Sequence, residues 1–341
     1  MADLAKKAKA EESPEDKVAK LSQKFETSRG VVNVDYETLC LCSLTGGEVP
    51  MCGAIIPDNS QNARSRDGSL GMLVGPSSLN NGIIRWASSR FENFELMAAQ
   101  DWRQAVKSTT LDGFKNQLDK YLVVVPCAQN LADVPNVVDG LLNDRCLQDV
   151  WIHWFTEQLA FPNRISERIL RRWKTRSMYM FQEFAPYAWF CARATLMMIT
   201  AVRHKLVRWD QKHPVDLQYM FYLPFCQVFV SDDLVHERLV PLLCRPKQSF
   251  VRGQVLKKDL ARIQDEWDIL SPEERLRRDY AFGDYPSPAR DSIVHTLWKK
   301  HCKPWHHNAG NLAAKLSEIE AEKAIREAEA MIREAEITSE P

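Results

Sequence analysis

Residues 216–236 read DLQYMFYLPFCQVFVSDDLVH, and this stretch decides the expected fold. Asp216 opens a short helical segment, and the apolar run Cys226–Val230 that follows is typical of a buried strand. The acid pair Asp232–Asp233 comes directly after that run, and a helix is expected over 234–243. In α/β proteins ligands bind where strands end, because side chains there face a common crevice. The stretch therefore predicts an α/β unit with an acidic site at the end of its strand.

The acids of this stretch are candidate ligands of a divalent cation. Carboxylates that converge at one strand end repel each other, and a bound cation relieves that repulsion. Because the ligands are oxygens, Mg²⁺ or Mn²⁺ is favoured over zinc. Such a site activates water for the cleavage of a phosphodiester bond. The alternative is that Asp216 and Asp232 are helix N-caps, a role that aspartate often fills.

The same residues carry a resemblance to the PIN-like nuclease domains. In that family an acid starts a helix, a hydrophobic strand follows, and a Thr/Ser-x-Asp turn supplies a further metal ligand. Val228–Asp233 is similar to the strand and turn, with Ser231 as the hydroxyl residue, and Asp216 is similar to the preceding acid. The family's first acid ends the first strand, and VVNVDYETL at Val31–Leu39 matches that shape with Asp35 in the acid's place.

The resemblance implies a helix-rich α/β fold with a PIN-like three-layer core around a parallel sheet. It also implies a Mg- or Mn-dependent nuclease, for which RNA is the substrate we expect, with Asp35, Asp216 and Asp232 as metal ligands. A long insertion separates the first two of these acids, and the family's mid-chain acid would be Glu157 or Glu183. The expected catalytic residues are Asp35, Glu183, Asp216, Asp232 and Asp233. The competing interpretation is a non-catalytic interaction or regulatory protein with an incomplete acid cluster.

Ser231 and His236 are expected to bind the substrate beside these acids. His236 follows Asp232 by four residues and would share its helical face, where it could position a phosphate or a water molecule. The alternative for His236 is an exposed histidine on the surface of its helix.

A dense basic segment, Arg164–Arg176, is a candidate surface for the RNA backbone. It holds six basic residues and one acid, and Arg168, Arg171 and Arg172 are expected to contact phosphates. Trp173 lies among these charges and would stack on a base. The alternative is a solvated helix face whose tryptophan belongs to the core.

Changes in composition divide the chain into three parts. Residues 1–28 are a charged segment that we expect to be mobile, and 29–265 are the PIN-like core. Two stretches interrupt that core: 43–86, which is loop-rich because seven of the thirteen glycines fall in it, and the helices expected over 90–209. Residues 266–341 are a helical extension whose acidic last helix is a candidate contact for a protein partner or a second copy of the chain.

The overall composition bounds the class of protein. The chain has 341 residues, of which 45 are basic, 45 are acidic and 45% are hydrophobic, which excludes a wholly disordered or fibrous chain. The longest apolar stretch, Phe184–Val202, contains Arg193, and this favours a buried helix over a membrane span. Most of the nine cysteines lie in apolar runs, as expected of free thiols in a reducing cytoplasm. Because the net charge is zero, any affinity for RNA must come from a local patch.

Overall fold

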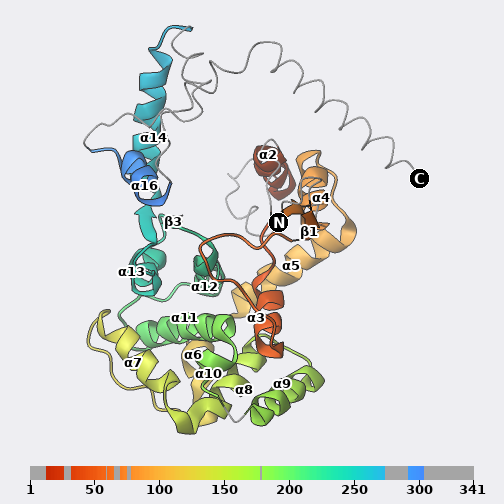
Figure 1. The fold of residues 1–341 in the computed structure, drawn as a ribbon, viewed down its shortest axis with the longest axis vertical. Helices are drawn as coiled ribbons and strands as arrows, with labels where there is room; N and C mark the ends of the chain where they lie inside the picture. The colour runs from red at the N-terminus through yellow and green to blue at the C-terminus, as the bar shows by residue number, and fades with distance from the viewer. Residues whose placement is uncertain are drawn as a thin grey trace. The chain divides into compact units, whose positions relative to one another are not determined.

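The computed structural model describes most of the chain and divides it into two compact units, residues 1–250 and residues 251–341. Helices dominate the described part (Figure 1). The described residues are 13–26, 32–58, 60–64, 70–74, 78–176, 179–272 and 291–302.

The core of the first unit is built around helix α11, Pro186–Arg203. Most of its side chains are buried, including those of Tyr187 and Cys191. Nearly every position of this helix is apolar, and such a helix needs neighbours on all sides. Helices α3 (Tyr36–Thr45) and α7 (Asp133–Leu142) both pack against it. Proline in the first turn is compatible with the helix, because the missing N–H would have no partner there.

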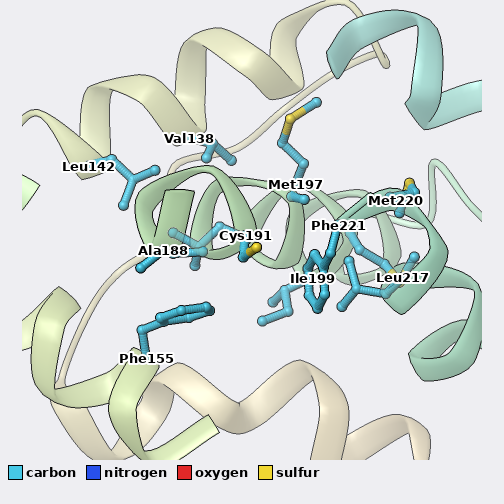
Figure 2. Packing of buried hydrophobic residues seen from close by; sticks show 14 of the residues in the cluster. Val138, Leu142, Phe155, Ala188, Cys191, Met197, Ile199, Leu217, Met220 and Phe221 are labelled. Carbon is cyan, nitrogen blue, oxygen red and sulfur yellow. The ribbon is translucent and has the colours of Figure 1, made fainter. Parts of the chain in front are cut away.

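Three further helices complete this core: α8 (Gln148–Gln158), α10 (Phe181–Phe184) and α12 (His213–Met220). Figure 2 shows that Phe155 of α8 and Leu142 of α7 lie on opposite sides of α11. The core is therefore a set of helices packed around one buried helix.

Helix α11 confirms the buried helix that the apolar stretch predicts. The guanidinium of Arg193 donates to both carboxylate oxygens of Asp139 on α7, with Nε–Oδ1 at 2.5 Å and Nη2–Oδ2 at 2.9 Å. The positive charge of Arg193 inside the apolar stretch is therefore neutralised by an ion pair at the contact between α7 and α11. Among the described residues, we find no helix with both the length and the apolar character needed to cross a bilayer.

The remaining helices of the first unit connect these elements, and the described part of 90–209 is largely helical, as expected. A second, smaller core contains Val18 and Trp86, from two helices that pack together. The remaining helices are α2 (Pro14–Glu26), α4 (Ser78–Ala87), α5 (Asn93–Ser108), α6 (Leu111–Lys115), α9 (Asn163–Thr175) and the 3₁₀ helices η1 (Asn116–Tyr121), η2 (Arg145–Leu147) and η3 (Leu223–Phe225).

Residues 228–252, which begin inside the stretch that decides the expected fold, form a strand, a helix and a second strand. Strand β3 is Val228–Ser231, helix α13 is Leu234–Leu243 and strand β4 is Ser249–Arg252. The two strands are parallel neighbours in a two-stranded sheet. The predicted helix over 234–243 is therefore confirmed. The strand begins at Val228 and not at the predicted Cys226, because Cys226 is the C-cap of the 3₁₀ helix η3 and its N–H donates to the main-chain oxygen of Leu223 at 3.2 Å.

The glycine-rich segment 43–86 contains the turns and short strands that its composition predicts. Strands β1 (Ser60–Arg64) and β2 (Leu70–Val74) pair antiparallel, with Asn62 opposite Met72. Helix α4 also begins inside this segment.

The strand predicted at Val31–Val34 is reduced to a single antiparallel bridge between Asn33 and Pro57 within the described residues. The segment after it is helix α3, because Asp35 caps a helix there. Across the described part of the chain, the sheets are β1–β2 and β3–β4, each of two strands. This helix-rich arrangement is compatible with an α/β protein, and the PIN-like three-layer core stays a prediction.

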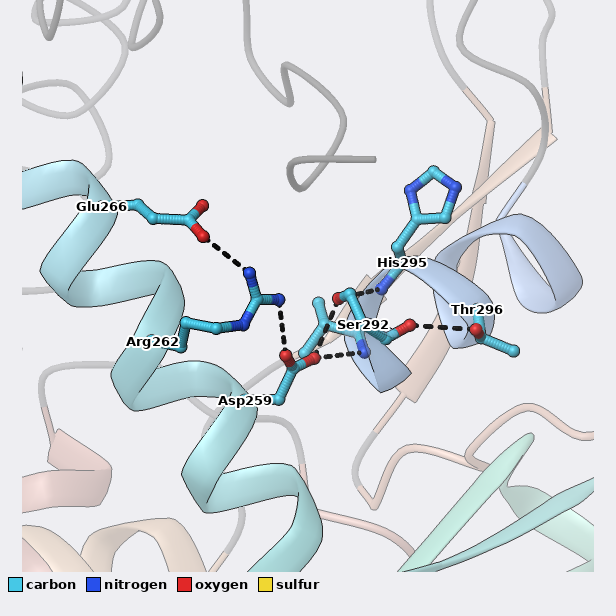
Figure 3. Close-up of polar contacts among 7 residues, drawn as sticks. Asp259, Arg262, Glu266, Ser292, His295 and Thr296 are labelled. Atoms are coloured by element: carbon cyan, nitrogen blue, oxygen red, sulfur yellow. Dashed lines mark hydrogen bonds and ion pairs between the residues drawn. The ribbon is translucent and has the colours of Figure 1, made fainter. Parts of the chain in front are cut away.

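The second unit is described at helices α14 (Gly253–Asp268) and α16 (Ile293–His301), which pack together. Asp259 of α14 accepts hydrogen bonds from the hydroxyl of Ser292 at 2.8 Å and from the main-chain N–H of Val294 at 2.9 Å (Figure 3). This buried carboxylate therefore accepts hydrogen bonds at the start of α16, where main-chain N–H groups have no partner within the helix. The predicted acidic last helix lies outside the described residues.

Candidate functional site

A cavity of about 660 Å³ lies beside helix α12 and the turn that joins β3 to α13. Asp216, Asp232 and Asp233 all line it. The structure therefore brings three of the five predicted catalytic acids to one cavity. The other charged or titratable residues of its lining are Arg208, Asp210, Lys212, His213 and Arg238.

Local structure explains why these acids face the same space. Asp216 lies in the first turn of α12, where a carboxylate is favoured by the partial positive charge of the helix N-terminus. Asp233 occupies the N-cap position of α13, with extended φ and ψ of −75° and 131°. Its main-chain N–H donates to Ser231 Oγ at 3.1 Å, which closes the turn after β3. The end of a strand and the start of a helix thus meet at one cavity.

His236 connects the two elements that carry the acids. Its Nδ1 lies 2.8 Å from Ser231 Oγ, and its Nε2 lies 2.8 Å from the main-chain oxygen of Asp216. Burial lowers the pKa of His236, although the hydrogen bond to the Asp216 carbonyl and the charge of Asp233 act in the opposite direction. Nε2 must donate to the carbonyl, so Nδ1 of the neutral ring accepts from the serine hydroxyl.

The environment of His236 corrects the role predicted for it. Its side chain is 2% exposed and both ring nitrogens have protein partners, so it neither contacts a substrate phosphate nor lies on the helix surface. Ser231 is engaged in the same contacts. Both residues connect the turn after β3 to α12; the burial of His236 argues against the direct phosphate contact predicted for it, whereas the substrate contact of the half-buried Ser231 stays a prediction.

Basic side chains line the same cavity as the acids. Arg208, Lys212 and Arg238 belong to its lining, and Arg238 Nη1 donates to the main-chain oxygen of Leu206 at 2.9 Å. Sequence reasoning missed these residues. The signal was present, because residues 208–213 read RWDQKH directly before the first acid of the site.

Asp35 lies at the start of helix α3 and does not line the cavity. Its carboxylate accepts from the main-chain N–H of Thr38 at 2.8 Å and caps α3, and it is not part of the cavity lining. The next residue, Tyr36, receives a hydrogen bond from Gln218 of α12 at 3.3 Å. Asp35 is therefore a helix cap and is removed from the set of acids that share the cavity.

The two candidates for the mid-chain acid also lie elsewhere. Glu183 is an exposed residue of the short helix α10. Glu157 accepts from Lys120 and Tyr121, and these contacts lower its pKa. Neither glutamate lines the cavity, so Glu183 is not part of the observed acidic site.

The acids of the cavity suit a metal ion that is bound together with its substrate. Within the described ranges, no group of three or more His, Cys, Asp or Glu side chains is arranged to hold one. Magnesium, however, keeps several waters and is commonly bound by one or two carboxylates together with substrate phosphates. The oxygen donors of Asp216, Asp232 and Asp233 suit a magnesium ion of that kind, and the basic lining suits the phosphate.

The predicted basic helix is α9, and its residues divide into two groups. Trp173 is 4% exposed and its Nε1 donates to the main-chain oxygen of Tyr179 at 2.7 Å, so it cannot stack on a base. Arg172 donates to the main-chain oxygen of Leu44 at 3.0 Å and lies over the ring of Phe184. Both residues hold the fold together, and their predicted contacts with RNA are corrected.

The exposed residues Arg164, Arg168 and Arg171 form the other group. A helix places these three positions within one narrow face, opposite the buried tryptophan. We call this set the arginine face.

Comparison of the chain with protein-family models, with curated protein sequences and with solved structures gave no match. The interpretation of the site therefore depends on its geometry and chemistry.

Proposed function

We propose that the protein is a metal-dependent nuclease that hydrolyses RNA phosphodiester bonds in the cavity beside α12. The observation that supports this proposal is the joint lining of one cavity by Asp216, Asp232 and Asp233, which come from two separate elements. Paired carboxylates and basic side chains in one cavity suit an anionic substrate bound together with a divalent cation. The resemblance of residues 216–260 to PIN-like nuclease domains points the same way.

Each group of the cavity has a role in this proposal. One or two of the carboxylates of Asp216, Asp232 and Asp233 would hold a Mg²⁺ or Mn²⁺ ion together with a substrate phosphate, and the ion would supply an activated water and stabilise charge on the leaving oxygen. Arg208 and Lys212 neutralise the phosphate that enters the cavity. Ser231 and His236 fix the distance between α12 and the turn after β3, which positions the carboxylates.

The arginine face supplies affinity for the rest of the RNA. Its members are exposed, and no ion pair to a described acid is present at Arg164, Arg168 or Arg171. Guanidinium groups at helical spacing that have no ion pair to a described acid suit a phosphate backbone, because each contact releases a condensed counterion.

A second candidate function is RNA binding without catalysis. Two observations favour it: Asp35 caps α3, and the described carboxylates do not form a three-ligand group. In this case the acids of the cavity are helix-terminal residues, and the arginine face alone explains affinity for RNA.

The test is cleavage of end-labelled single-stranded RNA by the full chain with Mg²⁺, with Mn²⁺ and with a chelator. We expect metal-dependent cleavage that Asp232→Asn reduces by about a hundredfold or more, while thermal stability is unchanged or higher because carboxylate repulsion is relieved. The control is Asp101→Asn, at an exposed position of α5 outside the cavity. Metal-independent loss of RNA, or equal activity in the two variants, contradicts the nuclease proposal. RNA binding without cleavage selects the second candidate.

A further inference from the structure

A second cavity, of about 760 Å³, lies in the first unit, and its described lining shares no residue with that of the acidic site. Helices α4 and α5 supply most of its lining, and Gln218 of α12 completes it. Its volume falls within the range of about 300–1,000 Å³ that is typical of small-molecule sites. The residues that decide its chemistry are Gly82, Arg85, Trp86, Glu92, Glu95 and Trp102.

Glu95 provides a fixed negative charge in this cavity. It accepts from the main-chain N–H of Glu92 at 2.9 Å, from Trp86 Nε1 at 2.9 Å and from Arg85. Burial alone would raise its pKa, but the hydrogen bonds from Glu92, Trp86 and Arg85 and the charge of Arg85 outweigh burial and lower it. The carboxylate is therefore ionised and held rigidly near neutral pH.

The charges of the lining do not cancel. Arg85 Nη2 lies 2.5 Å from Glu95 and 3.1 Å from Glu92, so one cation faces two carboxylates and the described lining has a net charge of −1. The Glu92 side chain is 49% exposed, and besides its ion pair with Arg85 it accepts from the main-chain N–H of Glu95 in the capping box of α5, so its charge is held at the start of α5 beside the cavity.

Aromatic side chains line the same space. Trp86, Trp102 and Phe94 all belong to the lining, and Phe94 is 64% exposed. Aromatic faces attract cations, most strongly for tryptophan, and they also cover apolar groups. Rings combined with an excess carboxylate favour a ligand that is apolar and positively charged.

We propose that the cavity between α4 and α5 binds a small organic cation with an apolar body, such as an alkyl- or arylammonium compound. The tryptophan rings contact the apolar body and the ammonium group, and Glu92 supplies the excess negative charge. This site is independent of the proposed nuclease activity.

Gly82 keeps the cavity open. It is a buried residue inside helix α4, where glycine is unfavourable by about 1 kcal/mol relative to alanine. A Cβ atom at this position would lie 3.4 Å from Trp86 Cζ2 and 3.8 Å from Glu95 Oε1. The backbone has no need of glycine here, so a larger side chain can be introduced to fill the cavity.

The test uses three compounds that share a benzyl group and differ in charge: benzyltrimethylammonium, benzyl alcohol and phenylacetate. Binding to the full chain is followed by calorimetry and by tryptophan fluorescence. We expect the cation to bind at least about tenfold more tightly than the neutral compound, and the anion to bind least.

Two variants locate the site. Glu92→Gln should weaken binding of the cation by about fivefold and leave the neutral compound unaffected, whereas Gly82→Leu should abolish binding of both. The control is Glu167→Gln, an exposed acid of α9. Circular dichroism of each variant establishes that it is folded. Equal affinity for the three compounds, no binding at 10 mM cation, or unchanged cation binding in a folded Gly82→Leu variant would overturn the proposal.

Discussion

The hydroxyl oxygen of Ser231 lies 2.8 Å from Nδ1 of His236. The opposite ring nitrogen lies 2.8 Å from the main-chain oxygen of Asp216, so one buried imidazole joins the end of β3 to the first turn of α12. Since Asp216 belongs to α12 and Asp232 and Asp233 follow directly after β3, this contact helps to set how far apart the three acids are.

We predict that the protein loses stability as the pH falls from about 7.5 to 5.5, and that His236 accounts for part of the loss. Burial lowers the pKa of His236 and of His213 in the folded state, whereas an unfolded histidine titrates near 6.5. Below that pH the unfolded chain binds more protons, and the free energy of unfolding decreases. Asp233 faces the ring and opposes the effect in part.

The measurement is urea denaturation at several pH values. His236→Gln should reduce the slope of stability against pH by up to about 1.4 kcal/mol per pH unit. His153→Gln, at an exposed histidine of α8, is the control. Identical slopes in wild type and His236→Gln would show that the buried imidazole does not resist protonation.

Asp139→Asn should destabilise the first unit by about 1–2 kcal/mol, because Arg193 loses its bidentate ion pair with the carboxylate between α7 and α11. Asp149→Asn, at an exposed position in the first turn of α8, should change stability much less. Thermal or urea denaturation measures both variants, and equal small effects would show that the pair contributes nothing.

Replacing Arg164, Arg168 and Arg171 by glutamine should weaken RNA binding. It should also flatten the dependence of log K on log salt by about one unit for each lost phosphate contact. The matched control removes the same charge at exposed positions elsewhere, Arg90, Lys107 and Lys247. If both triple variants behave alike, the arginine face is a solvated surface and not an RNA site.

Asp259→Asn should loosen the contact between α14 and α16 by about 1–3 kcal/mol, because the buried carboxylate accepts from Ser292, Val294 and Arg262. The amide cannot accept as many hydrogen bonds as the carboxylate. Hydrogen exchange at the amides of 293–301 reports this directly, and unchanged protection there would contradict the assigned role of Asp259.

The sequence predicted correctly those helices and strands whose signal lies in neighbouring residues. The apolar run before two acids predicted strand β3 and helix α13, and the apolar stretch around Arg193 predicted a buried helix. Both predictions depend on burial periodicity and capping residues, which can be recognised from neighbouring positions in the sequence. The same reasoning misplaced Asp35, since an acid after a short β-branched run fits a strand end and a helix N-cap equally well.

Side-chain direction on a helix was harder to predict from residue types. Trp173 and Arg172 lie among exposed charges in sequence, yet they face the core because α9 packs against α3 and α8. That packing joins residues far apart in the chain, as does the contact of His236 with the main chain of Asp216. The cavity between α4 and α5 likewise includes Gln218, which no local pattern links to Trp86.

The most direct test of the nuclease proposal is anomalous diffraction from crystals of the full chain grown with Mn²⁺ and a phosphorothioate RNA. The account predicts an anomalous peak about 2.0–2.6 Å from a carboxylate oxygen of Asp216, Asp232 or Asp233, and its loss in Asp232→Asn crystals. Crystals that contain bound RNA but show no peak in this cavity, or a peak at other residues only, would contradict it.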